Sequence, residues 1–367
     1  MMESKPKIHR NEIFDRTLEE AVMSRIINLM SDTVTHPTEE MRKAMYEAKV
    51  GDDVQKMDPT VIELQELAAE MVGMEDSLFV PSGTMGNLIA LMCHCRAGME
   101  VFMEQTSHIN LYEVGGIARV AGLMPNVIKG ERGIIDPDAL RAAIRKEDVH
   151  FPTPGMICIE NTHNAGGGTV YPLENLKEYR LIADKHNMKF HMDGARVFNA
   201  AAYLDVDVKE VVKHTDSVMF CLSKGLSAPV GSMLCGTKEF IKEALWVRKM
   251  LGGGLRQVGI LAAAGIISLK AMTKRLTDDH KAARRLAEGL NEIDGITVDL
   301  EAVQTNLVFI KFDEGKKDAV YFGNELKEKY GVLCGVRNPG LIRMLTHCQV
   351  SEEDIDYVLD CASKIMG

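Results

Sequence analysis

The 367-residue sequence has no long apolar run, no excess of positive charge and no closely spaced cysteine pair. Its most apolar stretch, Gly259 to Ser268, is too short to cross a bilayer. The formal net charge of −10 argues against nucleic-acid binding, because that requires basic patches that neutralise phosphates. The eight cysteines form no CxxC pair and most lie in apolar segments, which favours reduced, buried thiols. These absences predict a cytoplasmic protein without a membrane or nucleic-acid partner.

The length of the chain and its hydrophobic content of 46% predict two domains with well-filled cores. Residues 1–25 are charged and lack the apolar core of a signal peptide, so we predict an N-terminal extension there. We assign residues 26–275 to a large domain and residues 276–367 to a small C-terminal α/β domain. A long helix over 260–292 is expected to lead from one to the other.

A buried-strand pattern, Ser217 to Leu222, ends just before Lys224. Consecutive apolar and sulfur-bearing residues favour a strand inside the core. A lysine at the end of such a strand is costly to bury as an ammonium, and buried lysines are often tuned toward the neutral amine that attacks carbonyls. The segment Phe190 to Arg196 repeats the pattern, with Asp193 at the strand end. The interval between the two is long enough for one crossover between parallel strands.

Together Lys224 and Asp193 indicate pyridoxal phosphate (PLP), the lysine forming a Schiff base and the aspartate keeping the ring nitrogen protonated. Taken alone, a structural ion pair explains the two residues equally well. However, the alternation of strands and helices through residue 237 predicts a parallel sheet covered by helices. Ligands of such sheets bind beyond the carboxyl ends of the strands. Ser82, His108 and His163 also fall at or just beyond predicted strand ends, which favours one common site.

Several of these groups have an ordinary structural explanation as well. Ser82, Gly83 and Thr84 begin a predicted helix, where free N–H groups and hydroxyls either bind a phosphate or simply cap the helix. His108 is a surface histidine, a structural group with its hydrogen bonds satisfied, or an imidazole stacked on a flat cofactor ring.

Two arginines are candidates for binding anions. Arg343 lies between apolar residues of a predicted strand and suits bidentate binding of a carboxylate, unless an acidic residue pairs with it. Arg256 follows three glycines and is placed to reach an anion, although a surface salt bridge is the ordinary outcome for an arginine. The residues alone leave both alternatives open.

From about Ile27 to its C-terminus the chain resembles the L-threonine aldolases, in the β-eliminating-lyase group of fold-type-I PLP enzymes. The most specific matches are the segments VPSGTMGN (80–87), ENTH (160–163), HMDGAR (191–196), FCLSKG (220–225) and KMLGGGLRQ (249–257). The resemblance implies a large domain like that of aspartate aminotransferase, with a mainly parallel sheet. It also implies retro-aldol Cα–Cβ cleavage of L-threonine, L-allo-threonine or a related β-hydroxy-α-amino acid to glycine and an aldehyde.

The resemblance assigns roles to individual residues. Lys224 carries the cofactor, Asp193 pairs with its ring nitrogen, and His108 stacks on its ring. Ser82, Gly83 and Thr84 hold the phosphate. Arg196, which also lies against the cofactor, binds the substrate carboxylate with Arg343 and Ser31. Arg256 reaches the phosphate of a neighbouring subunit, because the family forms homotetramers with sites at the dimer interface. His163 lies near the β-hydroxyl, so the base is His108, His163 or a water between them. No metal site is predicted.

Two loops depart from the family pattern. Met30 replaces an arginine, and Gln55, Lys56 and Met57 replace the usual Tyr-Gly-Glu. The cofactor side is complete and the substrate side is altered. Two further hypotheses therefore remain beside the aldolase: another PLP reaction of an amino acid, such as β-elimination, racemisation or transamination, and a non-catalytic PLP-binding protein.

Overall fold

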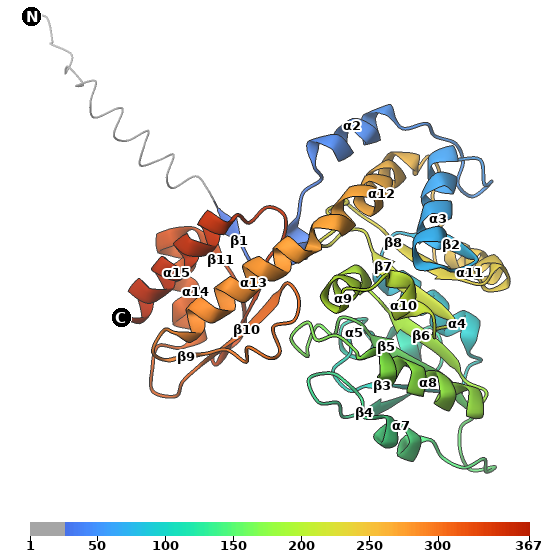
Figure 1. Ribbon diagram of the computed structural model, residues 1–367. Helices are drawn as coiled ribbons and strands as arrows, with labels where there is room; N and C mark the ends of the chain where they lie inside the picture. The colour runs from blue at the N-terminus through green and yellow to red at the C-terminus, as the bar shows by residue number, and fades with distance from the viewer. Residues whose placement is uncertain (1–25) are drawn as a thin grey trace, which may run out of the picture.

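The computed structural model describes residues 26–367, and the predicted N-terminal extension lies outside the described residues (Figure 1). The chain forms two lobes, the larger built on a seven-stranded sheet and the smaller on a four-stranded sheet. All eight cysteines carry free thiols. Within residues 26–367, none of the helices combines the length and the apolar character that crossing a membrane requires.

The large sheet is mainly parallel, as predicted. Its strand order is β2 (Asp76–Val80), β8 (Ser232–Gly236), β7 (Ser217–Cys221), β6 (Lys189–Asp193), β5 (Pro154–Glu160), β3 (Glu100–Glu104) and β4 (Met124–Ile128). Only β8 runs antiparallel to its neighbours. Strands β5, β6 and β7 pair in parallel, so their carboxyl ends meet at one edge of the sheet.

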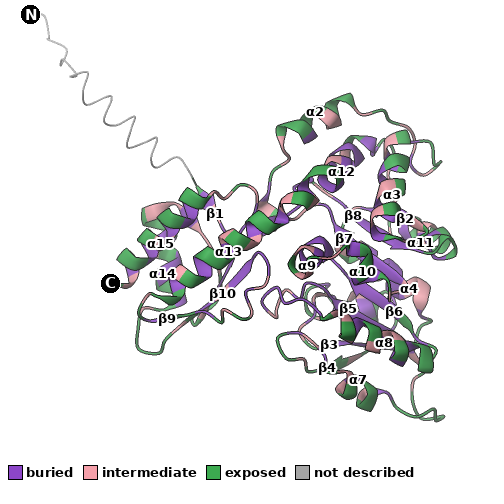
Figure 2. Ribbon diagram, viewed as in Figure 1, coloured by how far each residue is buried: buried purple, intermediate pink, exposed green. Residues whose placement is uncertain are grey.

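Helices cover both faces of this sheet, which explains why its central strands are buried in nearly every position (Figure 2). The helices of the large lobe are α2 (Glu39–Glu47), α3 (Pro59–Val72), α4 (Gly83–His94), α5 (His108–Leu111), α6 (Gly116–Arg119), α7 (Pro137–Ala143), α8 (Leu173–Lys185), α9 (Val197–Leu204), α10 (Val208–Val212), α11 (Lys238–Met250) and α12 (Gly259–Ala271). Phe190 and Phe220 pack in one core with α3 and α8. Met219 points to the opposite face, into a core with α4 and α11.

Local sequence signals set the ends of several helices. Thr38, Ser82 and Asp136 each cap a helix by accepting a hydrogen bond from a backbone N–H of the first turn. Gly73 ends α3 in the left-handed conformation that glycine adopts without strain. The cap at Ser82 matches the sequence-based expectation.

The single helix predicted over 260–292 is wrong in one respect, because a 3-10 turn, Met272–Arg275, separates α12 from α13 (Leu276–Asn291). The Oγ1 of Thr273 donates to the carbonyl of Leu269 at 2.8 Å, and Ser268 makes the same kind of bond to Ala264 at 3.0 Å. Such bonds compete with the helical ladder and bend helices. Helix α13 leads out of the large lobe into the smaller one (Figure 1).

The smaller lobe has an antiparallel sheet in the order β12 (Gly335–Asn338), β13 (Leu341–Leu345), β10 (Leu307–Phe312) and β9 (Ile296–Thr297). Helices α13, α14 (Ala319–Tyr330) and α15 (Glu352–Met366) supply its core. The predicted boundary between residues 275 and 276 falls at the start of α13.

The N-terminal end of the described chain also packs in the smaller lobe. Strand β1 (Ile27–Asn28) pairs in parallel with β11 (Val332–Leu333), and the side chains of Ile27 and Leu29 join the core of α13 to α15. The sequence-based boundaries assigned these residues to the large domain, because a pairing across 300 positions leaves no local pattern. This crossing places Ser31 and Asp32 between the lobes.

Candidate active site

A cleft of about 340 Å³ lies at the carboxyl ends of β5, β6 and β7 and is closed on one side by β12 and β13. Its lining includes nine of the predicted site residues: Ser31, Ser82, Gly83, Thr84, His108, Asp193, Arg196, Lys224 and Arg343. His163 and Arg256 do not line it. The parallel sheet thus brings together residues that lie far apart in the chain.

Lys224 follows β7 in a turn that is held from outside the strand. Its carbonyl accepts hydrogen bonds from the Oγ1 of Thr35 at 2.8 Å and from the N–H of Ser227 at 2.9 Å. Its ammonium group makes no hydrogen bond or ion pair with residues 26–367. The backbone is therefore fixed while the amine stays free for a ligand in the cleft.

Asp193 is 2% exposed at the end of β6. Its Oδ2 accepts a hydrogen bond from the Nδ2 of Asn87 at 2.8 Å, and its Oδ1 accepts one from the N–H of Ala195 at 3.1 Å. Both bonds orient the carboxylate. Asn87 reaches it because α4 packs closely on β7: a Cβ added to Gly86 would lie 2.7 Å from the Cγ of Met219.

His108 begins α5 directly beyond β3, where its N–H donates to Oε2 of Glu160 at 2.7 Å. Its ring Nδ1 lies 3.0 Å from Oε1 of Glu113. This hydrogen bond raises the pKa of His108 above its usual value, against the opposing effect of burial. Burial and the nearby Asp193 charge in turn raise the pKa of Glu113. The pair therefore holds a proton on the Nδ1 side of the ring and leaves Nε2 unused.

The amino-terminal end of α4 is the natural place for an anion in this cleft. Ser82 caps the helix by accepting the N–H of Met85, and Gly83 and Thr84 form its first turn. The first N–H groups of a helix have no carbonyl partner within it, and the helix dipole adds positive potential there. Both the cap and the anion site predicted for this segment are thus compatible with one arrangement.

Arg196 is bound to an acidic residue rather than being free. Its Nε and Nη2 donate to the two carboxylate oxygens of Asp32 at 2.7 and 2.6 Å, and both side chains are buried. Burial alone would raise the pKa of Asp32, but Arg196 holds it well below its usual value. One edge of the guanidinium is thus occupied, and Nη1 is left for a ligand.

Arg343 has no acidic partner within residues 26–367, so the ion-pair explanation of this arginine is wrong. Its Nη1 donates to Oδ1 of Asn164 at 2.8 Å, and its Nη2 donates to the carbonyl of Met30 at 3.2 Å. Its buried Nε has no hydrogen-bond partner in the described part of the chain. Burial, together with the charge of Arg337, lowers the pKa of Arg343 to about 10. A buried guanidinium in this state fits a carboxylate ligand.

His163 lies behind the cleft and is fully buried. Its Nε2 is 3.2 Å from Oε2 of Glu104, and its Nδ1 accepts the N–H of Gly166 at 3.1 Å. Burial would raise the pKa of Glu104, yet the neighbouring His163 and the hydrogen bonds from Thr106 lower it to about 2. Both ring nitrogens thus face protein groups, because the chain beyond β5 folds back through a bridge to Thr169.

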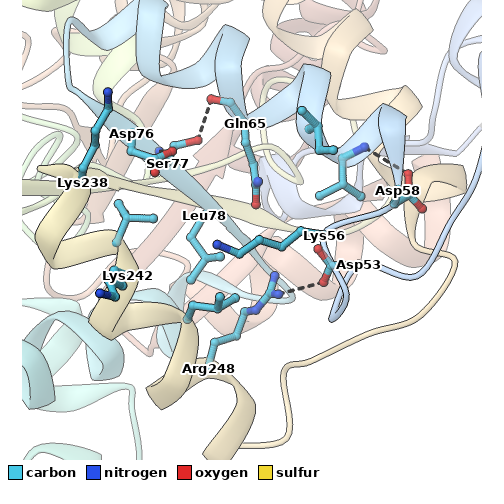
Figure 3. A pocket seen from close by; sticks show the side chains of 14 residues that line it. Asp53, Lys56, Asp58, Gln65, Asp76, Ser77, Leu78, Lys238, Lys242 and Arg248 are labelled. Atoms are coloured by element: carbon cyan, nitrogen blue, oxygen red, sulfur yellow. Dashed lines mark hydrogen bonds and ion pairs between the residues drawn. The ribbon is translucent and has the colours of Figure 1, made fainter.

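Arg256 and the departing loop 55–57 lie outside the cleft. The Nη1 of Arg256 pairs with Oδ2 of Asp52 at 2.9 Å on the surface. Lys56 lines a second cavity of about 300 Å³ between α3, β2 and α11, which shares no lining residue with the cleft (Figure 3). In this cavity the buried Arg248 lies 2.8 Å from Asp53 (Figure 3). The loop therefore does not reach the cleft of its own chain.

Known proteins similar to this chain identify its family. The family model of the beta-eliminating lyases matches residues 28–313. A protein of Arabidopsis thaliana named probable low-specificity L-threonine aldolase 2 is 46% identical over 345 residues, covering 93% of this chain and 97% of that one. The chain belongs to the beta-eliminating lyase family. The resemblance inferred from the motifs is confirmed.

Solved structures confirm the fold-type-I prediction for this member of the family. A threonine aldolase from Leishmania major superposes with a TM-score of 0.79 at 18% identity, covering 93% of this chain and all of that one. A structure of SPT with PLP superposes with a TM-score of 0.74 at 16% identity, covering 97% and 96% of the two chains.

The cleft-lining residues that sequence reasoning missed include Asn87, Glu113, Glu160 and Arg337. Asn87 is a polar residue in a mostly apolar helix that begins in a recognised motif, and this pattern could have identified it as a candidate site residue. Glu113 follows His108 by a few positions and Glu160 precedes His163 by a few, so both lie close in the chain to a predicted site residue. Arg337 lies in a polar segment of β12 that carries no pattern, so only the fold could reveal it.

Proposed function

We propose that the protein is a PLP-dependent aldolase that cleaves L-threonine, L-allo-threonine or a related β-hydroxy-α-amino acid into glycine and an aldehyde. The observation that carries this proposal is Arg343, a buried guanidinium that lies in the same cleft as Lys224 and Asp193 and has no acidic partner among residues 26–367. Such a group accounts for the carboxylate that an amino-acid substrate brings. The threonine aldolase named among the relatives supports the same reaction.

The residues of the cleft fit PLP. The free amine of Lys224 would attach it, Asp193 would accept a hydrogen bond from its ring nitrogen, and His108 would lie against its ring. Ser82, Gly83 and Thr84 would hold its phosphate at the amino-terminal end of α4. Bound PLP supplies an electron sink for the electron pair left at Cα when a bond to that atom breaks.

On the substrate side, Arg343 would bind the carboxylate with its unpartnered Nε edge. Arg196 would contribute through Nη1 while Asp32 holds its other edge, and Ser31 would add a hydroxyl. Fixing the carboxylate decides which bond at Cα is aligned for cleavage. A rigid Arg196–Asp32 pair therefore serves orientation as well as charge.

Among the proposed bases, His108 is the histidine that lines the cleft. Because Glu113 engages Nδ1, the unprotonated Nε2 would receive the proton of the β-hydroxyl, directly or through a water. His163 would not touch the substrate and would instead hold the side chain of Glu104 at the end of β3. Its fully buried ring is the reason for preferring His108.

The test of this function uses the purified protein and its Lys224→Ala variant. Each threonine isomer is added after PLP, and glycine and acetaldehyde are both measured. We expect equal amounts of the two products, in a reaction that requires Lys224. If PLP binds but no isomer and no longer-chain β-hydroxy-α-amino acid releases an aldehyde, the aldolase assignment is wrong. Release of 2-oxobutanoate and ammonia from threonine would instead establish β-elimination.

We also propose a homotetramer with its active sites at the dimer interface, and a cytoplasmic location in keeping with eight free thiols. Near the cleft and the second cavity, large apolar side chains stand in solvent: Met57, Leu111, Tyr112, Val114, Trp246 and Met250. A second copy of the chain would cover them and bring its Arg256 toward the phosphate subsite.

Mixing two inactive variants tests the shared site. In a hybrid dimer of Lys224→Ala and Arg256→Ala chains, one site regains both residues, since each comes from a different chain. We expect activity to reappear after the variants are unfolded and refolded together, and not after simple addition. Monomers in sedimentation velocity, or no regain in refolded hybrids, would contradict the shared site.

A further inference from the structure

A chain of hydrogen bonds leads from Asp193 away from the cleft, between α4 and the face of the sheet that α4 covers. The Nδ2 of Asn87 bonds to Oδ2 of Asp193 at 2.8 Å and to Oε1 of Glu113 at 2.9 Å. Its Oδ1 lies 3.1 Å from Nε2 of His191, whose Nδ1 lies 2.8 Å from Oγ of Ser217. The chain ends where Ser217 Oγ meets Nε2 of His94 at 2.7 Å.

Three elements of the fold build this chain. His191 and Asp193 stand two positions apart on β6, so both side chains point to the face that α4 covers. Ser217 is the direct partner of His191 in the register of β6 and β7. Asn87 and His94 lie seven positions apart on α4, which is two helical turns and therefore one face. His94 then stacks on Phe240, with ring centroids 4.5 Å apart.

The chemistry of Asn87 sets the direction of every bond. Both hydrogens of its Nδ2 point at carboxylates, and the reverse orientation would press its carbonyl oxygen against Asp193 and Glu113. Its Oδ1 must therefore accept, so Nε2 of His191 carries the hydrogen. The Nδ1 of His191 is then an acceptor for the hydroxyl of Ser217, and that oxygen accepts from His94.

Both histidines are neutral, which keeps one donor and one acceptor on each ring. Burial lowers the pKa of His191 to about 3, and burial lowers that of His94 to about 4. All donors of the chain thus point one way, from the edge of the sheet toward Asp193. Bonds aligned head to tail polarise one another and strengthen the last one.

We propose that Asn87, His191, Ser217 and His94 are positioning residues that present only donors to Asp193, so that the accepting oxygens of this carboxylate stay turned toward the ring nitrogen of PLP. The inference rests on the proposed function only for the presence of PLP, not for the reaction. A break in the chain lets the His191 ring take its other tautomer and frees the amide of Asn87 to turn.

The test compares His191→Leu with His191→Gln, because glutamine can still donate to Asn87 and leucine cannot. PLP affinity and the visible absorption spectrum of the bound cofactor are the first readouts, with kcat and KM for the cleaved substrate as the second. We expect the leucine variant to lose about tenfold in PLP affinity, as for a buried acceptor left unsatisfied, and the glutamine variant to regain most of it. The loss should appear in kcat, with KM nearly unchanged.

Ser217→Ala and Ser217→Thr make the same comparison at the next residue of the chain from Asp193. We expect Ser217→Ala to lose less PLP affinity than His191→Leu, and Ser217→Thr to retain the affinity because threonine keeps the hydroxyl. His280→Gln is the matched control, because this partly buried histidine bonds to Asn199 outside the chain. Equal losses in His191→Leu and His191→Gln, or an unchanged PLP affinity and spectrum in His191→Leu, would overturn the proposal. Since PLP binding is read directly, a protein that binds PLP but releases no aldehyde would refute the aldolase and still decide this inference.

Discussion

The two walls of the cleft satisfy their polar groups in different ways. On the wall of the large lobe, Asn87 donates hydrogen bonds to both Asp193 and Glu113. Glu113 is also hydrogen-bonded to the ring of His108. On the wall of the smaller lobe, Arg343 keeps a buried Nε without a partner, and Arg337 has no ion pair within residues 26–367. The first wall is preorganised by the protein itself, whereas the second is completed only by an anionic ligand.

The losses of stability and of ligand affinity that follow removal of a side chain should therefore differ between the two walls. Groups of the large-lobe wall support both the fold and the cofactor, since their partners are buried. The arginines of the smaller lobe should matter for the substrate alone. Four substitutions, taken from the largest expected effect to the smallest, test this division.

Asp32→Ala should have the largest effect, because it leaves the Arg196 guanidinium buried without its partner. We expect a loss of about 3–5 kcal/mol in the free energy of unfolding at neutral pH. The Arg196 pair lowers the pKa of Asp32, so its stabilisation is present above the unfolded-state pKa and is lost as the pH falls through the folded-state pKa. The difference between the proteins should thus shrink toward acid pH.

Urea titration followed by circular dichroism measures this prediction at several pH values. Asp294→Ala is the control, since Asp294 pairs with Lys316 on the surface and its removal should produce no measurable change. Equal stability of Asp32→Ala and the parent protein at neutral pH would show that the pair orients Arg196 without supporting the fold.

Arg343→Leu should lower kcat/KM by about a hundredfold, since one partner of a buried charge pair with the substrate is removed. PLP affinity should stay within about twofold, because Arg343 bonds to Asn164 and Met30 and not to Asp193, Glu113 or His108. Steady-state kinetics and PLP titration measure the two quantities. A parallel loss in both would mean that the two walls are not separate.

Glu113→Gln should move the acid limb of the pH profile of kcat/KM to lower pH. In the parent protein the hydrogen bond that His108 donates to Glu113 raises the pKa of His108, so the base form of the imidazole appears only above this raised value. Without the carboxylate, the unprotonated Nε2 is available at lower pH. The profile measured between pH 5 and about 9 decides, since the usual pKa of histidine is about 6.5. An unmoved limb would exclude His108 as the titrating base.

Arg337→Gln should have the smallest effect, because this arginine is exposed. We expect KM for an amino-acid substrate to rise by at most about fivefold, as for other solvent-exposed charges. The increase should fade at high ionic strength, since salt screens exposed charges more than buried ones. Kinetics at low and high salt measure this. A salt-independent loss as large as that of Arg343→Leu would make Arg337 an equal carboxylate ligand.

Local sequence patterns predicted the cofactor wall better than the substrate wall. Lys224 and Asp193 each end an apolar strand, and Ser82 caps a helix, so chain-local rules identified them. Arg343 also stood out in its strand, yet its freedom from an acidic partner was left open. Arg337 and the bond from Arg343 to the carbonyl of Met30 required the packing of two lobes.

The two histidines also show what local sequence patterns could not predict. His108 and His163 both follow a strand end, and no local rule separates the one that lines the cleft from the one buried behind it. The difference comes from the chain beyond each strand: His108 begins α5, while His163 is folded back against Thr169 and Glu104. The break in the helix at Met272–Arg275 was equally invisible, because its apolar period continues through the turn.

The sequence by itself determined the strands, the caps, the lysine and aspartate at the edge of the sheet and the family motifs, because these depend on residues close together in the chain. The tertiary structure alone decided the pairing of β1 with β11, the occupation of Arg196 by Asp32 and the donor chain from His94 to Asp193. Each of these joins residues from separate elements, and the burial that fixes their charges and tautomers exists only once those elements have packed.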